Sequence, residues 1–342
     1  MGVMVEARGL CKYFKTARGM LHAVEDLSFK IEEKTVLGVV GESGCGKSTL
    51  GRMLVGLHDS TSGNLLFNGE DVTRPDKKTK KMLYKQRQMI FQDPYSSLDP
   101  RKCVSDLIAE PLRIMKISRS RAEIEARVAE LMDTVGLARR YAYAYPHELD
   151  GGRRQRIGIA RALAVEPKFI VCDEPVSALD VSIQAQILNL LQDLQDEKGL
   201  TYMFITHNLS VVKHISDEIL VMYLGCEVEH AKTRELFAKP LHPYSKGLLS
   251  AIPIPSIHVE REEFIMPGEV ASPIDPEPGC RFASRCQYAR EICTRELPKL
   301  EEVLPNHFCA CHCVREINNL PPAGGAAQAA GATQKEEPAS AI

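Results

Sequence analysis

The chain has 342 residues, of which 44% are apolar and 26% charged, and its formal net charge is −2. This composition is ordinary for a soluble globular protein with one large or two smaller domains, and the small charge argues against a nucleic-acid partner. No apolar run approaches the ~18–20 residues that cross a bilayer, and the start of the chain lacks the features of a signal peptide. We therefore expect a soluble chain whose 11 cysteines are thiols or metal ligands, not disulfides.

The first 40 residues alternate short β-like runs with turns, as in residues 4–7, 23–31 and 35–40. Tyr13 lies in this N-terminal segment. Its ring could stack on an adenine base, or it could simply pack against its neighbours, and the residues alone leave both open.

A phosphate-binding loop follows the strand predicted at residues 35–40. Residues 41–49 (GESGCGKST) match G-x-x-x-x-G-K-[S/T] between that strand and a helix predicted at about residues 48–57. Glycines in such a loop let backbone N–H groups face phosphate oxygens, the lysine reaches the β- and γ-phosphates, and the hydroxyl of Ser48 binds Mg²⁺. The candidate nucleotide-binding residues are Gly41, Ser43, Gly44, Cys45, Gly46, Lys47, Ser48 and Thr49.

Strand and helix patterns alternate along the next 180 residues. A turn and a strand occupy residues 58–75, residues 77–81 (KKTKK) read as a solvated helix start, and helical periodicity runs from about 102 to 137. Strands are predicted at residues 169–174, 202–206 and 218–223, with an amphipathic helix around residues 183–194. This order predicts a parallel α/β sheet with a helical insertion at about residues 94–160, and the sheet pattern ends near residue 236.

Polar residues stand where the predicted strands end. Asp173 would hold Mg²⁺ through water, and Glu174 beside it would be the general base that polarises the attacking water. Gln92 could contact the γ-phosphate or Mg²⁺, and His207 could hydrogen-bond the γ-phosphate. The sequence therefore predicts ATP hydrolysis with Mg²⁺.

This set of motifs, in this order, resembles the nucleotide-binding subunit of ABC transporters over residues 1–236. Residues 41–49 match its Walker A motif, Gln92 its Q-loop, residues 169–174 (FIVCDE) its Walker B motif, residues 177–180 (SALD) its D-loop, and His207 its switch histidine. The resemblance implies a P-loop ABC ATPase core with an antiparallel β subdomain and an inserted helical subdomain. It also implies that Tyr13 stacks on adenine and that Asp180 contributes to nucleotide binding.

The signature motif departs from the family pattern. The family reads Leu-Ser-Gly-Gly-Gln, whereas residues 149–153 read LDGGR, so Gly151 and Gly152 remain and Asp150 replaces the serine. The family resemblance implies that this motif completes the site of a partner subunit. A carboxylate about 4 Å from phosphate costs roughly 4 kcal/mol at an effective dielectric constant near 20, and Arg153 and Arg154 could offset part of it. We expect the site that faces Asp150 to be weakened, which fits a heterodimer.

Residues 237–318 form a proline-rich extension that resembles the C-terminal region of oligopeptide/dipeptide-type subunits, in residues 240–253 (PLHPYSKGLLSAIP) and 279–286 (GCRFASRC). In related subunits four cysteines can hold a [4Fe–4S] cluster, which here would be Cys280, Cys286, Cys293 and Cys309. Zinc and plain thiols are the alternatives, and Cys311, His312 and Cys313 are further candidates. Residues 319–342 are rich in Ala, Gly and Pro, and we expect them to be disordered.

The resemblance implies an ATPase subunit that energises an importer for peptides, with nickel or another small solute as alternatives. Its partners would be a second ATPase subunit, two transmembrane permease subunits and, indirectly, an extracellular or periplasmic substrate-binding protein. The subunit would lie peripherally on the cytoplasmic face of the cell membrane. Two other functions stay open: a regulatory subunit that binds ATP with weak hydrolysis, and a soluble ABC ATPase that takes no part in transport. The cargo is not encoded in any motif.

Overall fold

The computed structural model describes residues 2–117, 120–252, 266–268 and 271–322. An eight-stranded sheet lies at its centre, with the strand order β11-β12-β10-β9-β3-β8-β7-β6. The five strands from β9 to β6 run parallel, which confirms the parallel α/β prediction. The strands of this sheet are β3 (Val36–Val40), β6 (Arg87–Ile90), β7 (Phe169–Asp173), β8 (Thr201–Ile205), β9 (Glu218–Tyr223), β10 (Cys226–Lys232), β11 (Glu301–Leu304) and β12 (His307–Cys309).

A second, antiparallel sheet has the order β2-β1-β4-β5 and confirms the expected antiparallel β subdomain. Its strands are β1 (Val3–Thr16), β2 (Gly19–Glu32), β4 (Ser62–Phe67) and β5 (Glu70–Asp71). The sequence predicted only fragments of β1 and β2. Register shifts near Ala7, Leu10 and Lys12 interrupt the alternation of inward and outward side chains, so the two long strands read as short runs.

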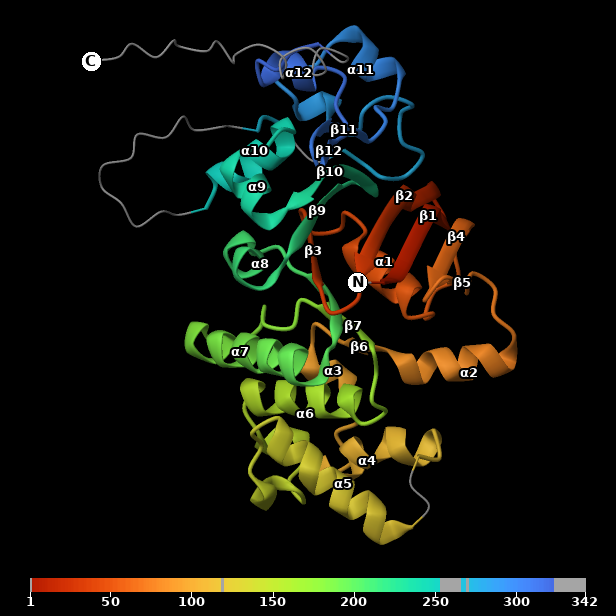
Figure 1. Ribbon diagram of the computed structural model, residues 1–342, viewed down its shortest axis with the longest axis vertical. Coiled ribbons are helices and arrows are strands. Elements are labelled where there is room, and N and C mark those ends of the chain that lie inside the picture. Colours follow the sequence, from red (N-terminus) through yellow and green to blue (C-terminus); the bar gives the residue numbers. More distant parts are fainter. Residues whose placement is uncertain (1, 118–119, 253–265, 269–270, 323–342) are drawn as a thin grey trace, which may run out of the picture.

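Helices α3 (Pro94–Ser97), α4 (Val104–Ile114), α5 (Arg121–Thr134) and α6 (Gly151–Leu163) lie between β6 and β7 in the chain and form the lower part of the molecule in Figure 1. The helical pattern from 102 to 137 is broken into α4 and α5. Lys116 adopts φ 54° after α4, and Ser120 begins α5 with a capping box to Glu123. Buried Ile108, Leu131 and Ile157 belong to one apolar cluster with the sheet, so the helical part is packed onto it.

The other helices are α1 (Lys47–Leu54), α2 (Lys77–Gln86), α7 (Val181–Lys198), α8 (Leu209–Ile215), α9 (Thr233–Ala238), α10 (Pro243–Ser250), α11 (Glu291–Arg295) and α12 (Val314–Ile317). Short 3-10 turns are η1 (Arg139–Tyr141), η2 (Pro146–Glu148) and η3 (Ala283–Arg285). Among the helices that the structure describes, none combines the length and apolar character needed to cross a membrane.

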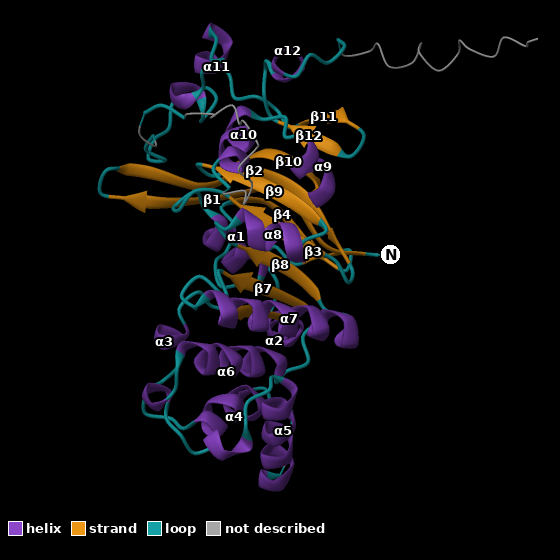
Figure 2. Cartoon of the chain, turned by 90° about the vertical axis from the view of Figure 1, so that its left-hand side faces the viewer, coloured by secondary structure: helices purple, strands orange, loops and turns teal. Residues whose placement is uncertain are grey.

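The expectation that the sheet ends near residue 236 is wrong, because the extension returns to it. β12 pairs with β10, and β11 pairs with β12, at the upper end of the sheet in Figure 2. Fully buried Glu229 on β10 anchors this return. Its carboxylate accepts hydrogen bonds from the N–H groups of Leu241 (2.7 Å) and His242 (2.8 Å) and lies 2.7 Å from Nε2 of His307. Strands as short as β11 and β12 leave no periodic signal.

Candidate functional site

The carboxyl ends of four neighbouring parallel strands bring the predicted ATPase residues together. Residues 41–49 follow β3, His207 follows β8, Asp173 ends β7 and Gln92 follows β6. Since β3, β8, β7 and β6 are consecutive in the sheet, residues up to 166 positions apart in sequence meet at one place. Ligands of open α/β sheets bind outside this end of the strands.

The phosphate loop has a backbone that needs glycine. Gly46 adopts φ 104°, and a Cβ there would lie 2.0 Å from the carbonyl oxygen of Ala23, so no other residue fits without moving β2. Lys47, which begins α1 and is 4% exposed, donates hydrogen bonds from Nζ to the carbonyl oxygens of Gly41 (2.7 Å) and Glu42 (2.9 Å). The loop thus curves around the lysine whose charge would face the phosphates.

Ser48 and Asp173 form the pair expected at a magnesium site. The Ser48 hydroxyl donates to Oδ1 of Asp173 at 2.7 Å, and Asp173 is 1% exposed. Burial raises the pKa of Asp173 above the ordinary carboxyl value, and the hydrogen bond from Ser48 counters part of that shift. Hydroxyl and carboxylate oxygens are hard donors of the kind that Mg²⁺ prefers, so the residues present fit this ion.

Glu174 lies between the other two predicted catalytic residues. Nε2 of Gln92 donates to its Oε2 at 3.1 Å, and Nδ1 of His207 lies 3.1 Å from its Oε1. The backbone of Glu174 adopts φ 44°, in the left-handed region, where it is held by a hydrogen bond from its N–H to Ile205 and by Ser177 on its carbonyl oxygen. A non-glycine residue in this conformation carries strain that neighbours must hold in place.

Tyr13 lies on β1 opposite His22 on β2. The two rings stack with centroids 4.2 Å apart, and the Tyr13 hydroxyl donates to Oε1 of Glu25 at 2.6 Å. Burial and this carboxylate raise the pKa of Tyr13, which keeps the phenol neutral. Stacking of Tyr13 on adenine stays a proposal. Its partners His22 and Glu25 are residues that the sequence did not single out.

Asp150 caps the N-terminus of α6. Its Oδ1 accepts the N–H of Arg153 at 2.8 Å, and its Oδ2 is paired with the Arg153 guanidinium. Arg154 points elsewhere: it donates to the carbonyl oxygen of Pro146 and lies over the ring of Tyr95. Of the two arginines expected to offset the Asp150 charge, only Arg153 pairs with it.

The signature glycines pack against the segment that contains Asp180. A Cβ on Gly152 would lie 2.6 Å from the side chain of Ile183, and one on Gly151 would lie 3.0 Å from that of Leu179. Asp180 immediately precedes α7 and its side chain is exposed. The LDGGR and SALD segments are therefore neighbours on one surface.

Five of the six clustered cysteines line one small pocket: Cys280, Cys286, Cys293, Cys311 and Cys313. Cys309 does not line it; this residue lies on β12, 1% exposed, packed with Leu241 and Val314. All 11 cysteines are free thiols. Within the described ranges, no group of three or more His, Cys, Asp or Glu side chains is arranged to hold a metal ion.

Sequence reasoning also missed the contacts that two distant residues make with the phosphate loop. The N–H of Glu42 donates to the Tyr244 hydroxyl at 2.8 Å, and the Arg285 guanidinium donates to the Glu42 carboxylate. Tyr244 and Arg285 lie 202 and 243 residues further along the chain, and no local pattern could have revealed them.

Comparisons with known proteins agree with this geometry. A family model described as "ABC transporter" matches residues 24–177, and one described as "Oligopeptide/dipeptide transporter, C-terminal region" matches residues 228–293. The chain is 47% identical over 319 residues to the oligopeptide transport ATP-binding protein AppF of Bacillus subtilis, covering 90% of this chain and 97% of that protein. It is 52% identical over 310 residues to OppF of the same organism, covering 90% and 96%. It is 46% identical to the dipeptide transport ATP-binding protein DppF of Haemophilus influenzae, covering 90% and 96%.

Two solved structures share the fold. One is a dimeric ATP-binding cassette in a post-hydrolysis state bound to ADP and phosphate, with a TM-score of 0.63 and 27% identity over 68% of this chain and 99% of that one. The other is part of an ABC transporter complex of Clostridium perfringens, with a TM-score of 0.62 and 27% identity over 70% and 92%. Both matches cover about two thirds of the chain.

Proposed function

The chain belongs to the ATP-binding subunits of ABC transporters of the oligopeptide/dipeptide type, and on that basis we propose that it hydrolyses ATP to drive the import of peptides. The observation that carries the peptide assignment is the match of residues 228–293 to the C-terminal region of that transporter type. The curated relatives that cover 90% of the chain are transport proteins, which favours this function over a soluble ATPase outside transport. We therefore also propose that the subunit lies peripherally on a membrane, against permease subunits supplied by other chains.

In the proposed mechanism the residues at the carboxyl end of the sheet have separate chemical roles. Residues 41–49 surround the phosphates, and Lys47 places its charge on the β- and γ-phosphates. Glu174 accepts a proton from the attacking water, while Gln92 and His207 orient its two carboxylate oxygens. Ser48 and Asp173 would hold Mg²⁺, which neutralises phosphate charge when it is bound.

The partner of this subunit is proposed to be a different ATPase subunit. ABC cassettes dimerise, as the solved post-hydrolysis dimer illustrates. The family arrangement makes Asp150 part of the site formed with the partner's phosphate loop, where its charge opposes the nucleotide. A heterodimer avoids two weakened sites, since this subunit's own phosphate loop can face an unmodified signature in the partner.

Transport is tested by reconstituting this subunit with its permease subunits, partner ATPase and substrate-binding protein in proteoliposomes. We expect ATP-dependent accumulation of a labelled di- or tripeptide, because hydrolysis is the energy source for import. The same assay is run with labelled nickel, the alternative cargo. Accumulation of nickel without peptide, or no nucleotide dependence, would contradict the peptide assignment.

We also propose that the cysteine pocket holds a [4Fe–4S] cluster, with the set of four ligands changed from the expectation. Five cysteines from three segments line one small pocket, and thiolates are the type of soft donor that iron–sulfur clusters use. Cys311 lines this pocket and Cys309 does not. The proposed ligands are Cys280, Cys286, Cys293 and Cys311.

Cluster content and ligand identity are tested together on anaerobically purified full chain. We expect about four iron and four sulfide per chain with a broad visible absorption. Cys311→Ser removes one proposed ligand and should abolish the absorption. Cys309→Ser, in the same segment but outside the pocket, should retain it. Colourless, iron-free wild-type protein would refute the cluster. Loss of colour with Cys309→Ser alone would support the ligand set expected from the sequence, in which Cys309 is the fourth ligand.

A further inference from the structure

Glu42 of the phosphate loop is held by the extension through two different groups. The hydroxyl of Tyr244, on α10, accepts the Glu42 N–H at 2.8 Å. Nη1 of Arg285, on η3, donates to both carboxylate oxygens of Glu42, at 3.1 and 2.9 Å. The carbonyl oxygen of the same Glu42 accepts the hydrogen bond from Lys47. One residue therefore connects the extension to the lysine of the phosphate loop.

The side chains that hold Glu42 belong to, or pack against, a buried aromatic cluster. The rings of Tyr223, Tyr244 and Phe282 meet with centroids 4.7–5.5 Å apart, and all three side chains are fully buried or nearly so. Arg285 is 8% exposed and also donates to the Tyr223 hydroxyl at 3.4 Å. Burial works against the charge of Arg285, but its hydrogen bonds to Tyr223 and Glu42 keep its pKa above the ordinary value. A buried, fully charged guanidinium against a carboxylate fixes both in place.

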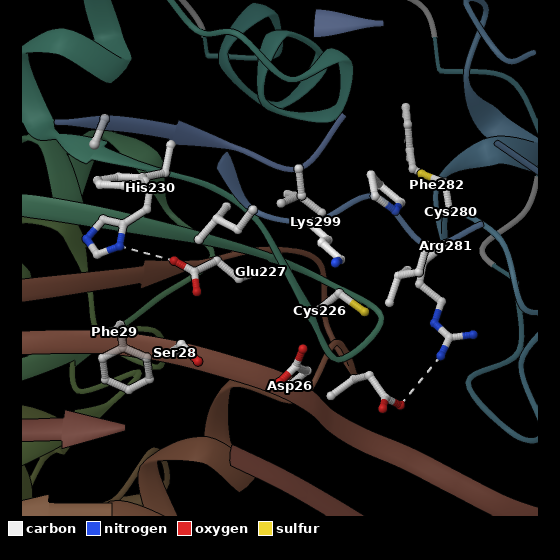
Figure 3. A pocket seen from close by; sticks show the side chains of 18 of the residues that line it. Asp26, Ser28, Phe29, Cys226, Glu227, His230, Cys280, Arg281, Phe282 and Lys299 are labelled. Carbon is white, nitrogen blue, oxygen red and sulfur yellow. Dashed lines mark ion pairs between the residues drawn. The ribbon is translucent and has the colours of Figure 1, made fainter. Parts of the chain in front are cut away.

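The same segment of the extension also reaches the residues around Tyr13. Arg281, four residues before Arg285, extends from the wall of a cavity of about 770 Å³ and lies 3.5 Å from Glu25 (Figure 3). Glu25 is the residue that accepts the hydroxyl of Tyr13 and contacts His22. The segment between Cys280 and Cys286 thus contacts the proposed adenine side through Arg281 and the phosphate side through Arg285.

We propose that Tyr244 and Arg285 are positioning residues of the ATPase: the C-terminal extension fixes Glu42 and thereby sets the shape of the phosphate loop. Neither residue touches the reacting atoms, and both act through Glu42. The inference rests on the proposed nucleotide site at residues 41–49. It assigns to the extension a role in nucleotide affinity in addition to any role of its cysteines.

The affinity of the full-length chain for a fluorescent ATP analogue tests this inference. Tyr244→Phe removes only the hydroxyl and should raise Kd about fivefold, because the Glu42 N–H loses its partner. Arg285→Gln should raise Kd about tenfold, and Arg285→Lys, which retains the charge, should recover part of the loss. In the assembled complex we expect KM for ATP to rise while kcat changes little, a split that general destabilisation would not produce.

Tyr202→Phe is the matched control. Tyr202 is also fully buried, and within the described part of the chain its hydroxyl has no hydrogen-bond partner. This variant should bind the analogue as the wild type does. Wild-type affinity in both Tyr244→Phe and Arg285→Gln would overturn the inference while leaving the nucleotide site intact. A wild-type chain that does not bind the analogue would instead refute the site itself.

Discussion

ATP hydrolysis at this subunit's own site in the assembled complex should fall about a hundredfold or more when Glu174 is replaced with Gln. A general base contributes about 10²–10⁴-fold to the rate of proton transfer, and Gln cannot accept the proton. Its side chain has the same shape, so it should remain between Gln92 and His207. Nucleotide affinity should therefore survive. Single-turnover hydrolysis and analogue binding, measured on the same preparation, separate the two effects.

Glu166→Gln is the control for this experiment. Like Glu174, whose φ is 44°, Glu166 has a left-handed backbone conformation, with φ 55°. Its carboxylate forms an ion pair with Arg127. It lies outside the proposed site, on an exposed loop before β7. Glu166→Gln should keep wild-type turnover. If Glu174→Gln also keeps it, the hydrolytic residue lies elsewhere or in the partner subunit, and the chain fits the regulatory alternative.

Turnover of the complex should rise when Asp150 is replaced with Ser. The bare cost of a carboxylate near phosphate is roughly 4 kcal/mol at a dielectric constant near 20. The side chain is 57% exposed and paired with Arg153, which screens a substantial part of the charge. About half of the cost would remain, which corresponds to roughly a thirtyfold gain at the site that faces this signature. Turnover is best measured with the other site inactivated by Glu174→Gln, so that only the facing site contributes.

Asp76→Ser provides the control for helix capping. Asp76 caps α2 in the same way, accepting the N–H of Thr79 at 2.8 Å, and it is exposed and away from the proposed site. Both substitutions exchange one good N-cap for another, so any change seen only with Asp150→Ser reflects charge at the nucleotide. Unchanged or lower turnover in Asp150→Ser would contradict the proposed weakening of that site.

The position of the candidate ATPase residues in the fold could be predicted from the sequence because each stands beside a local signal. The loop at residues 41–49, Gln92, Asp173 and His207 all lie at or within two residues of the end of a strand whose apolar run is visible in the sequence. Parallel strands place such ends together. The pairing of Ser48 with Asp173, and of Glu174 with Gln92 and His207, follows from that arrangement.

Some elements were obscured by local irregularity. Register shifts in β1 and β2 break the two-residue alternation, so two strands of 14 residues each looked like short runs. β11 and β12 have four and three residues, too few to show a period. Their place in the sheet depends on contacts to Glu229 from residues 12, 13 and 78 positions away.

The sequence by itself determined the nucleotide chemistry, the parallel sheet and the departure at Asp150, because each is expressed within a few neighbouring residues. Tertiary structure alone decided which cysteines share a pocket, which arginine pairs with the Asp150 carboxylate and which residues hydrogen-bond to Glu42. These depend on where the extension returns to the sheet. That return is set by buried side chains far apart in the chain, and their pairing has no signature in either sequence segment taken alone.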